Sequence, residues 1–333
     1  LAVAERALEE VDESTDPAEH ARLLRDRGLF LANLGLPGAA ELFLEALEIV
    51  DRAVDDDQLH ATLLNGLAGK YMLASMPREA IITATQALEI ATRANDPREI
   101  SVAHNLRGTC RTYLGQLDEA FADFRAAALF APRSNGGAEL RFHVNYSDML
   151  GLLGRHREAF DVAAAGIVRA RELGVERASG TLMVQNMVEP LLTLGDIDGA
   201  TSRLSAVPIG RPQVLNDQYV VLTRIRVLAW QGRIDDAERM REEWMPSLRR
   251  TGELERQAWY RIVENDIALD IARGQWTHAL DAVVAMTQDE GFVLLHAYRL
   301  LLESGWVVAE VRASGGDVDV AVSAIRRLWA EIP

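Results

Sequence analysis

The sequence has a single cysteine, a single lysine and no long apolar run. Cys110 is the only cysteine, so the chain cannot form an internal disulfide. No apolar stretch approaches the roughly 18 residues that cross a bilayer, and no signal segment opens the chain. These absences predict a soluble, globular protein of the cytoplasm.

Positive charge is scarce as well. The 35 basic side chains, of which Lys70 is the only lysine, stand against 50 acidic ones, and the formal net charge is −15. A nucleic-acid interface needs a clustered positive field to hold phosphates. The composition therefore argues against direct binding of nucleic acid.

Motifs for catalysis or metal binding are also missing. A phosphate-binding loop ending at Lys70 would need glycine where Leu64 stands and Ser or Thr where Tyr71 stands. The histidines lack zinc-ligand spacing, and the acidic run 55–57 lacks the glycine and glutamate of a calcium loop. Cys110, among small and polar neighbours, reads as a packed and inert thiol. The sequence thus predicts no enzymatic activity, no metal and no cofactor.

A repeat of about forty residues organises nearly the whole chain. A glycine-like turn residue is followed five residues later by alanine in these pairs: Ser75/Ala80, Gly115/Ala120, Gly154/Ala159, Gly195/Ala200, Gly232/Ala237, Gly274/Ala279 and Gly316/Ala321. Gly35 with Ala39 or Ala40 begins the series, and successive turn residues lie 37 to 42 residues apart. Eight units at one period indicate a repeat architecture.

Each unit has the pattern of two amphipathic helices joined by a tight turn. Apolar residues recur at spacings of three and four on both sides of the turn. Glycine suits the turn because it ends a helix in the left-handed conformation without steric cost. One such pair cannot bury its own apolar face, so stacked pairs predict an all-α solenoid with a concave inner wall.

The expected organisation is a single domain over residues 1–333. Residues 1–15 would be the second helix of a preceding unit, which suggests a piece of a longer protein, and about eight helical pairs would fill residues 16–333. The segment 207–212 contains two prolines and a glycine and cuts a second helix short. We predict a flexible seam there, without a domain boundary, because the period resumes at Gly232.

Five asparagines fall at one structural place, on the first helix of their units. Asn65, Asn105, Asn145, Asn186 and Asn265 precede the unit alanine by 14 or 15 residues. Helix interiors disfavour asparagine, so the recurrence needs a cause. The amides either bind an extended ligand along the inner wall or bind the neighbouring helix pair and hold the pitch of the array.

Other side chains next to these asparagines are candidate groove residues that could give charge and shape selectivity. They are His104, Arg107, Arg111, His143, Tyr146, Met149, Met187, Arg224 and Arg261.

Between Ile100 and Pro132 the unit resembles the tetratricopeptide repeat. The small, turn, aromatic and terminating positions of that family are occupied by Gly108, Gly115, Ala120, Phe124, Ala127 and Pro132. Arg107 and Arg111 depart from the leucine and tyrosine expected there. The resemblance implies a right-handed superhelical solenoid.

The arginine-rich and alanine-rich pairs, with joints such as 150–159 and 191–200, resemble the sensor region of large ATP-binding LuxR-type transcriptional regulators of the maltose-regulator kind. That resemblance implies a bacterial protein in which an ATPase module precedes the repeats and a DNA-binding helix-turn-helix follows them. Neither module lies within this sequence.

The expected function is that of a non-enzymatic sensing segment. It would bind a peptide, a small molecule or a protein in its groove and pass a shift between superhelical states to a neighbouring domain. A free-standing scaffold that holds partner proteins is the alternative, and a helical-repeat enzyme is a third.

Overall fold

The computed structural model describes residues 2–11, 13–134, 136–177, 179–210, 215–288 and 294–331. Within these ranges every regular element is a helix: 17 α-helices and one short 3₁₀ turn. The prediction of an all-α fold is confirmed.

Eight consecutive helix pairs follow the first helix, α1 (Ala2–Glu10). The first helices of the pairs are α2 (Pro17–Asn33), α4 (Asp57–Leu73), α6 (Pro97–Tyr113), α8 (Gly137–Leu152), α10 (Ser179–Thr193), α12 (Leu215–Trp230), α14 (Arg256–Ala272) and α16 (Leu294–Ala313). The second helices are α3 (Ala39–Ala53), α5 (Pro77–Arg93), α7 (Leu117–Phe130), α9 (His156–Glu172), α11 (Ile197–Ala206), α13 (Ile234–Leu254), α15 (Trp276–Thr287) and α17 (Asp319–Glu331). The 3₁₀ turn η1 (Ala131–Arg133) follows α7.

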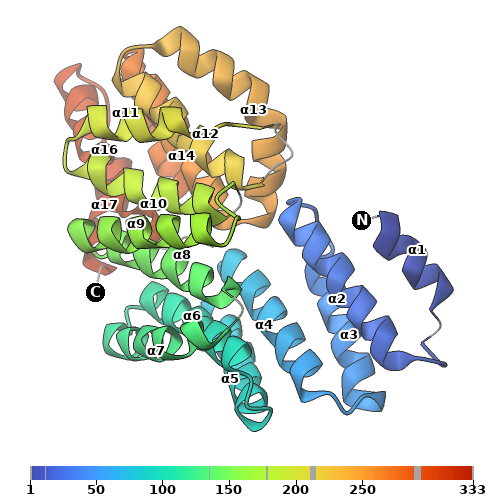
Figure 1. Cartoon of the computed structure of the whole chain (residues 1–333). Helices are drawn as coiled ribbons and strands as arrows, with labels where there is room; N and C mark the ends of the chain where they lie inside the picture. The colour runs from blue at the N-terminus through green and yellow to red at the C-terminus, as the bar shows by residue number, and fades with distance from the viewer. Residues whose placement is uncertain are drawn as a thin grey trace.

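Neighbouring helices pack in succession along the chain (Figure 1). The two helices of a pair contact each other, and each first helix from α4 onward also contacts the first helix of the next pair. First helices thus form one continuous layer, and second helices pack against its other side.

The turns within the pairs use the left-handed backbone that the repeat predicts. Six turn glycines from Gly35 to Gly274 have φ between 61° and 83°, and Ser75 takes the same conformation with φ of 60°. The last turn differs from the prediction, because Gly315, with φ of 81°, takes the left-handed conformation in place of Gly316. The turn there is longer, because α17 begins four residues after Gly315, whereas α7 begins two residues after Gly115.

Small residues allow the two helices of a pair to approach closely. The unit alanines from Ala80 to Ala321 are at most 1% exposed. A Cβ on Gly108 would lie 3.0 Å from the ring of Phe124 on the partner helix. Gly28 and Gly66 make the same kind of room for Phe43, at 2.8 and 3.2 Å. Glycine in these helices is therefore a packing requirement.

The predicted seam begins where α11 ends, at Ala206. Residues 207–210 are not helical, and Arg224 of α12 donates hydrogen bonds to the carbonyls of Leu204 and Val207, the latter at 2.6 Å. Arg211 and Pro212, the last two residues of the seam, lie outside the described residues. None of the described helices is long and apolar enough to cross a membrane.

Candidate functional site

A cavity of about 380 Å³ lies at the centre of the array. Among the described residues its wall is built from first helices and the residues beside them, and it draws on all seven from α2 to α14. The volume falls within the range of about 300–1,000 Å³ that small-molecule sites occupy.

One repeat position supplies the wall in four consecutive units. Arg141, Leu182, Tyr219 and Arg261 all line the cavity, and each precedes its unit alanine by 18 residues. This position lies one helical turn before the asparagine position, so it shares a face with it. The regular repeat thus directs four chemically different side chains into one space.

The array closes across this cavity. The Nε2 of Gln257, on α14, donates to the hydroxyl of Tyr113, on α6, at 2.7 Å across 144 residues of sequence. Beside this contact, Tyr219 donates to the buried carboxylate of Glu255 at 2.6 Å. Burial raises the pKa of Glu255, whereas the hydrogen bond from Tyr219 and the nearby charge of Lys70 act to lower it.

Arg141 differs from Arg261, the other arginine of the described cavity wall, in its hydrogen bonding. It makes no hydrogen bond or ion pair with any described residue. Its side chain is exposed, yet burial lowers its pKa. The two observations agree because the surface that Arg141 exposes lies in the cavity, between neighbouring helices. Its charge also lowers the pKa of Lys70, so two cations lie within electrostatic reach of each other.

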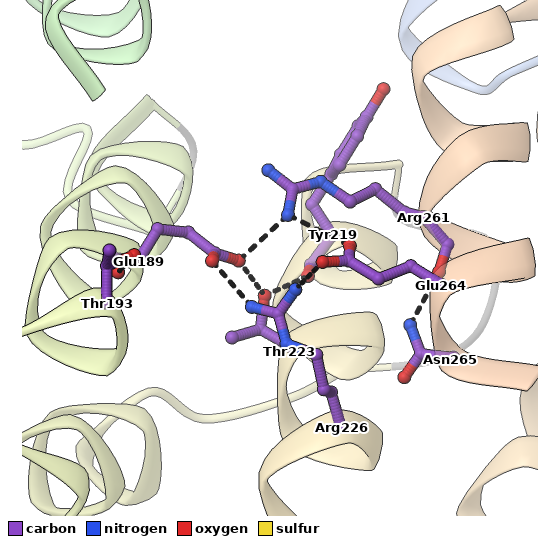
Figure 2. A network of polar contacts seen from close by, with 8 residues as sticks. All are labelled: Glu189, Thr193, Tyr219, Thr223, Arg226, Arg261, Glu264 and Asn265. Atoms are coloured by element: carbon purple, nitrogen blue, oxygen red, sulfur yellow. Dashed lines mark hydrogen bonds and ion pairs between the residues drawn. The ribbon is translucent and has the colours of Figure 1, made fainter. Parts of the chain in front are cut away.

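A buried ionic network joins three consecutive first helices next to the cavity (Figure 2). Arg226 of α12 bridges Glu189 of α10 and Glu264 of α14, with 2.5 Å between its Nη2 and a Glu189 oxygen. Arg261 reaches the same two carboxylates at 3.1 and 3.2 Å, and Thr223 donates to Glu189 at 3.2 Å. Two positive and two negative groups balance one another. Removing one member would leave a buried charge uncompensated, so we assign the network to holding α10, α12 and α14 together.

The asparagines lie between neighbouring helices. The Nδ2 of Asn65 donates to the backbone carbonyl and the carboxylate of Glu99, at 3.0 and 2.8 Å. The Nδ2 of Asn145 donates to the Oδ1 of Asn105 at 2.5 Å. Asn186 donates back to α8, to the carbonyl of Val144 at 2.8 Å and the hydroxyl of Ser147 at 3.0 Å. Asn265 instead donates to Arg261 within its own helix.

The contacts of Asn65, Asn105, Asn145 and Asn186 join neighbouring first helices, as the pitch-holding interpretation requires, whereas the contact of Asn265 does not. Asn65, Asn105, Asn186 and Asn265 are at most 7% exposed. Asn145 and Asn186 also line the cavity, so for these two the ligand interpretation keeps a structural basis.

Three of the other predicted groove residues meet at one carboxylate away from the cavity. His104, Arg107 and Arg111 of α6 all contact Asp123 of α7, which is 3% exposed, at 2.7, 3.3 and 2.6 Å. They hold the two helices of one pair together. The repeat pattern did not single out Asp123, although an acidic residue opposite three basic ones was a signal for it.

The remaining candidates divide between interhelix contacts and the cavity. The Nδ1 of His143 lies 3.1 Å from the carbonyl of Val162, and Tyr146 packs against Phe142 and Phe124. Met149 and Met187 are buried, and Arg224 binds the end of α11. Of the candidate residues, only Asn145, Asn186 and Arg261 line the central cavity.

Cys110 is fully buried, and burial raises the pKa of its thiol to about 12. Among the described residues, no group of three or more His, Cys, Asp or Glu side chains is arranged to hold a metal ion. Comparison with protein-family models and with curated proteins gave no match.

Sequence reasoning missed the residues that give the cavity its chemistry, chiefly Arg141, Tyr219 and Glu255. A signal for the first two was present. Shifting the alignment of the units by one helical turn places Arg141 and Tyr219 in register with Arg261. Glu255 precedes its unit alanine by 24 residues, as Asp56 and Asp96 do in their units, so the repeat also held a signal for an acidic residue at this helix start.

Proposed function

We propose that this chain is the non-enzymatic, ligand-sensing repeat segment of a multidomain transcriptional regulator. The observation that carries the proposal is the central cavity, whose wall draws on seven consecutive first helices. In this proposal the stacked pairs are tetratricopeptide-like units that form a right-handed superhelical solenoid. The chain would work in the bacterial cytoplasm, between an ATPase module and a DNA-binding helix-turn-helix.

The shape of the cavity supports sensing because its walls lie far apart in the chain. A ligand that contacts both α4 and α14 favours one relative position of the two halves. Such a ligand shifts the population of superhelical states by its difference in affinity between them. The flanking domains would receive that shift through the ends of the array.

A library of amino acids, sugars, organic acids and nucleotides tests the proposal through the melting temperature of the chain. We expect one compound class to raise the melting temperature, since a ligand that binds only the folded state stabilises it. The matched variant Leu182→Trp fills the cavity from its wall and should lose the response, with its fold checked by circular dichroism. Shifts of the same size in both proteins would contradict binding in the cavity.

A protein scaffold is the second candidate, favoured by the exposed tryptophans of the later pairs. Trp230, Trp306 and Trp329 are 44%, 53% and 48% exposed. Tryptophan is enriched at protein–protein interfaces relative to the rest of the protein surface. Capture of one defined partner that is lost in Trp306→Ala and kept in Leu182→Trp would favour the scaffold.

A further inference from the structure

We infer that the central cavity takes a small organic molecule through a single oxyanion, a carboxylate or a phosphate monoester, and that Arg141 is its anchor. This inference rests on the proposed function, because it names the ligand class of the same cavity. Three observations lead to it.

The first is the isolation of Arg141. A guanidinium carries five N–H donors in a planar fork that matches the two oxygens of a carboxylate or phosphate. Arg141 uses none of these donors on a described residue, and the surface that it exposes faces the cavity. Burying a charged group that has no hydrogen-bonding partner is costly in free energy. A bound anion would provide hydrogen-bond acceptors for the Arg141 guanidinium.

The second observation is the balance of the other charges. Arg261 and Glu264 belong to the neutral network with Glu189 and Arg226. Glu255 accepts from Tyr219 and lies within electrostatic reach of Lys70. Glu99 acts electrostatically on Arg141, but its carboxylate already binds Arg98 and Asn65. Arg141 is therefore the cation of the wall that no described carboxylate binds directly.

Acidic side chains also line the cavity. Asp148 lies seven residues after Arg141 on α8, about 10 Å along the helix axis. A polyanion such as a nucleoside triphosphate would place further negative charges near Asp148 and near Glu255. The wall therefore favours a ligand with one oxyanion at the Arg141 end over a polyanion.

The third observation concerns the surroundings of that end. Gln185 lines the cavity, is 6% exposed, and makes no hydrogen bond with a described residue. Its buried amide offers both a donor and an acceptor to a ligand. Apolar wall is contributed by Met72, Leu73, Val144, Leu152 and Leu182. The complementary ligand has one anionic end, one amide-binding polar group and an apolar body.

Matched probes test the charge requirement. Hexanoate, benzoate and phenyl phosphate are compared with the neutral hexanamide and benzamide by calorimetry and by melting temperature. We expect at least one anion to bind the wild-type chain and its amide counterpart to bind more weakly. The carboxylate and phosphate arms show which oxyanion the site prefers.

Arg141→Gln and Arg141→Lys identify the anchor, with Arg239→Gln on the surface of α13 as the control. Arg141→Gln should weaken binding of the anion by about tenfold to a hundredfold, the worth of a charge-assisted hydrogen bond. Arg141→Lys should keep part of the affinity, and Arg239→Gln all of it. Equal binding by Arg141→Gln and wild type would overturn the inference.

A measurement without ligand separates this role from a structural one. Because Arg141 makes no hydrogen bond or ion pair with a described residue, unliganded Arg141→Gln should melt no lower than wild type. A lower melting temperature would overturn the inference.

Failure of the anion inference and failure of the proposed function give different results. If the neutral probes bind as tightly as the anions, and Leu182→Trp abolishes the binding of both, the cavity site stands and the anion inference fails. If neither these probes nor the wider library bind, both fail.

Discussion

Asn105 and Asn145 show how one amide side chain links two helices of different pairs. Each lies on a first helix, and together they form a hydrogen bond of 2.5 Å in a largely buried environment. Helix propensity alone favours alanine at both positions. The two effects act on stability with opposite signs, so substitution shows which of them is larger.

Single changes Asn105→Ala, Asn145→Ala and Asn186→Ala should each lower the free energy of unfolding. Each leaves a buried polar group unpaired, at a cost of about 1–3 kcal/mol. Thermal and urea melts measure the loss, and Gln86→Ala, at an exposed site of α5, is the control. Unchanged melts at all three sites would contradict the pitch-holding interpretation and favour a ligand role for Asn145 and Asn186, which line the cavity.

Glu255 makes the stability of the folded chain depend on pH in an unusual direction. Burial raises its pKa, so the folded state holds the proton more tightly than the unfolded state does. Stability from this group is present below the ordinary pKa of 4.5 and is lost as the pH rises through the raised pKa of the folded state.

Glu255→Gln should therefore gain stability relative to wild type as the pH rises from about 5 to 8, since glutamine keeps an acceptor for Tyr219 without the charge. Urea melts across this range give the difference. Glu158→Gln is the control with opposite sign, because Arg155 holds the pKa of Glu158 below its ordinary value. Glu158→Gln should be less stable than wild type at neutral pH, and this difference in stability should disappear as the pH falls. A pH-independent difference for Glu255→Gln would contradict the assigned cause.

At the scale of elements, glycine inside a first helix has two different meanings. Gly108 of α6 lies against Phe124, and a Cβ there would also come within 3.3 Å of the backbone carbonyl of Ala120. A Cβ on Gly151 of α8 would meet no atom of another described helix within 4 Å. The first is required by packing between helices, and the second only weakens its helix.

Gly108→Ala and Gly151→Ala should change stability in opposite directions. Overpacking at Gly108 should cost about 1–3 kcal/mol, which exceeds the gain in helix propensity. Gly151→Ala should raise the free energy of unfolding by up to about 1 kcal/mol. Chemical denaturation of the two variants measures both signs. Destabilisation by both would show that the helix pair of α8 is packed more tightly than its geometry indicates.

The helices could largely be predicted from the sequence, because the residues that begin and end a helix lie close together in the chain. Pro17, Pro77 and Pro97 each begin a helix, where a missing N–H costs nothing, and the side chains of Asp16 and Asp96 cap two of those helices. Local signals were ambiguous at residues 315–316, where two adjacent glycines both suited the turn. The candidate site was harder to predict from the sequence. No sequence pattern shows that Arg141 has no hydrogen-bonding partner on the described helices around it.

The whole molecule adds what no single pair contains. The contact between Gln257 and Tyr113 joins α14 to α6 across three intervening helix pairs. Helices so far apart in the chain share no local sequence pattern, so the contact could not be predicted from the sequence. In a linear repeat array each unit contacts only its neighbours, whereas here α6 and α14 contact each other.

Gln257→Ala should expose this coupling in amide hydrogen exchange. We expect faster exchange at both ends of the lost contact, the end of α6 and the start of α14, with a net loss of about 0.5–1.5 kcal/mol. Gln231→Ala removes a local contact with Thr201 and is the control. If exchange rises only in α14, the two helices do not stabilise each other.

The contact between α6 and α14 also bears on how this chain can change in length. Linear repeat proteins gain and lose whole units readily, because each new unit meets the same kind of neighbour. Here a unit inserted or deleted between Tyr113 and Gln257 would separate α14 from α6 and change the cavity wall. The number of units between these two helices is therefore fixed by the geometry of the cavity.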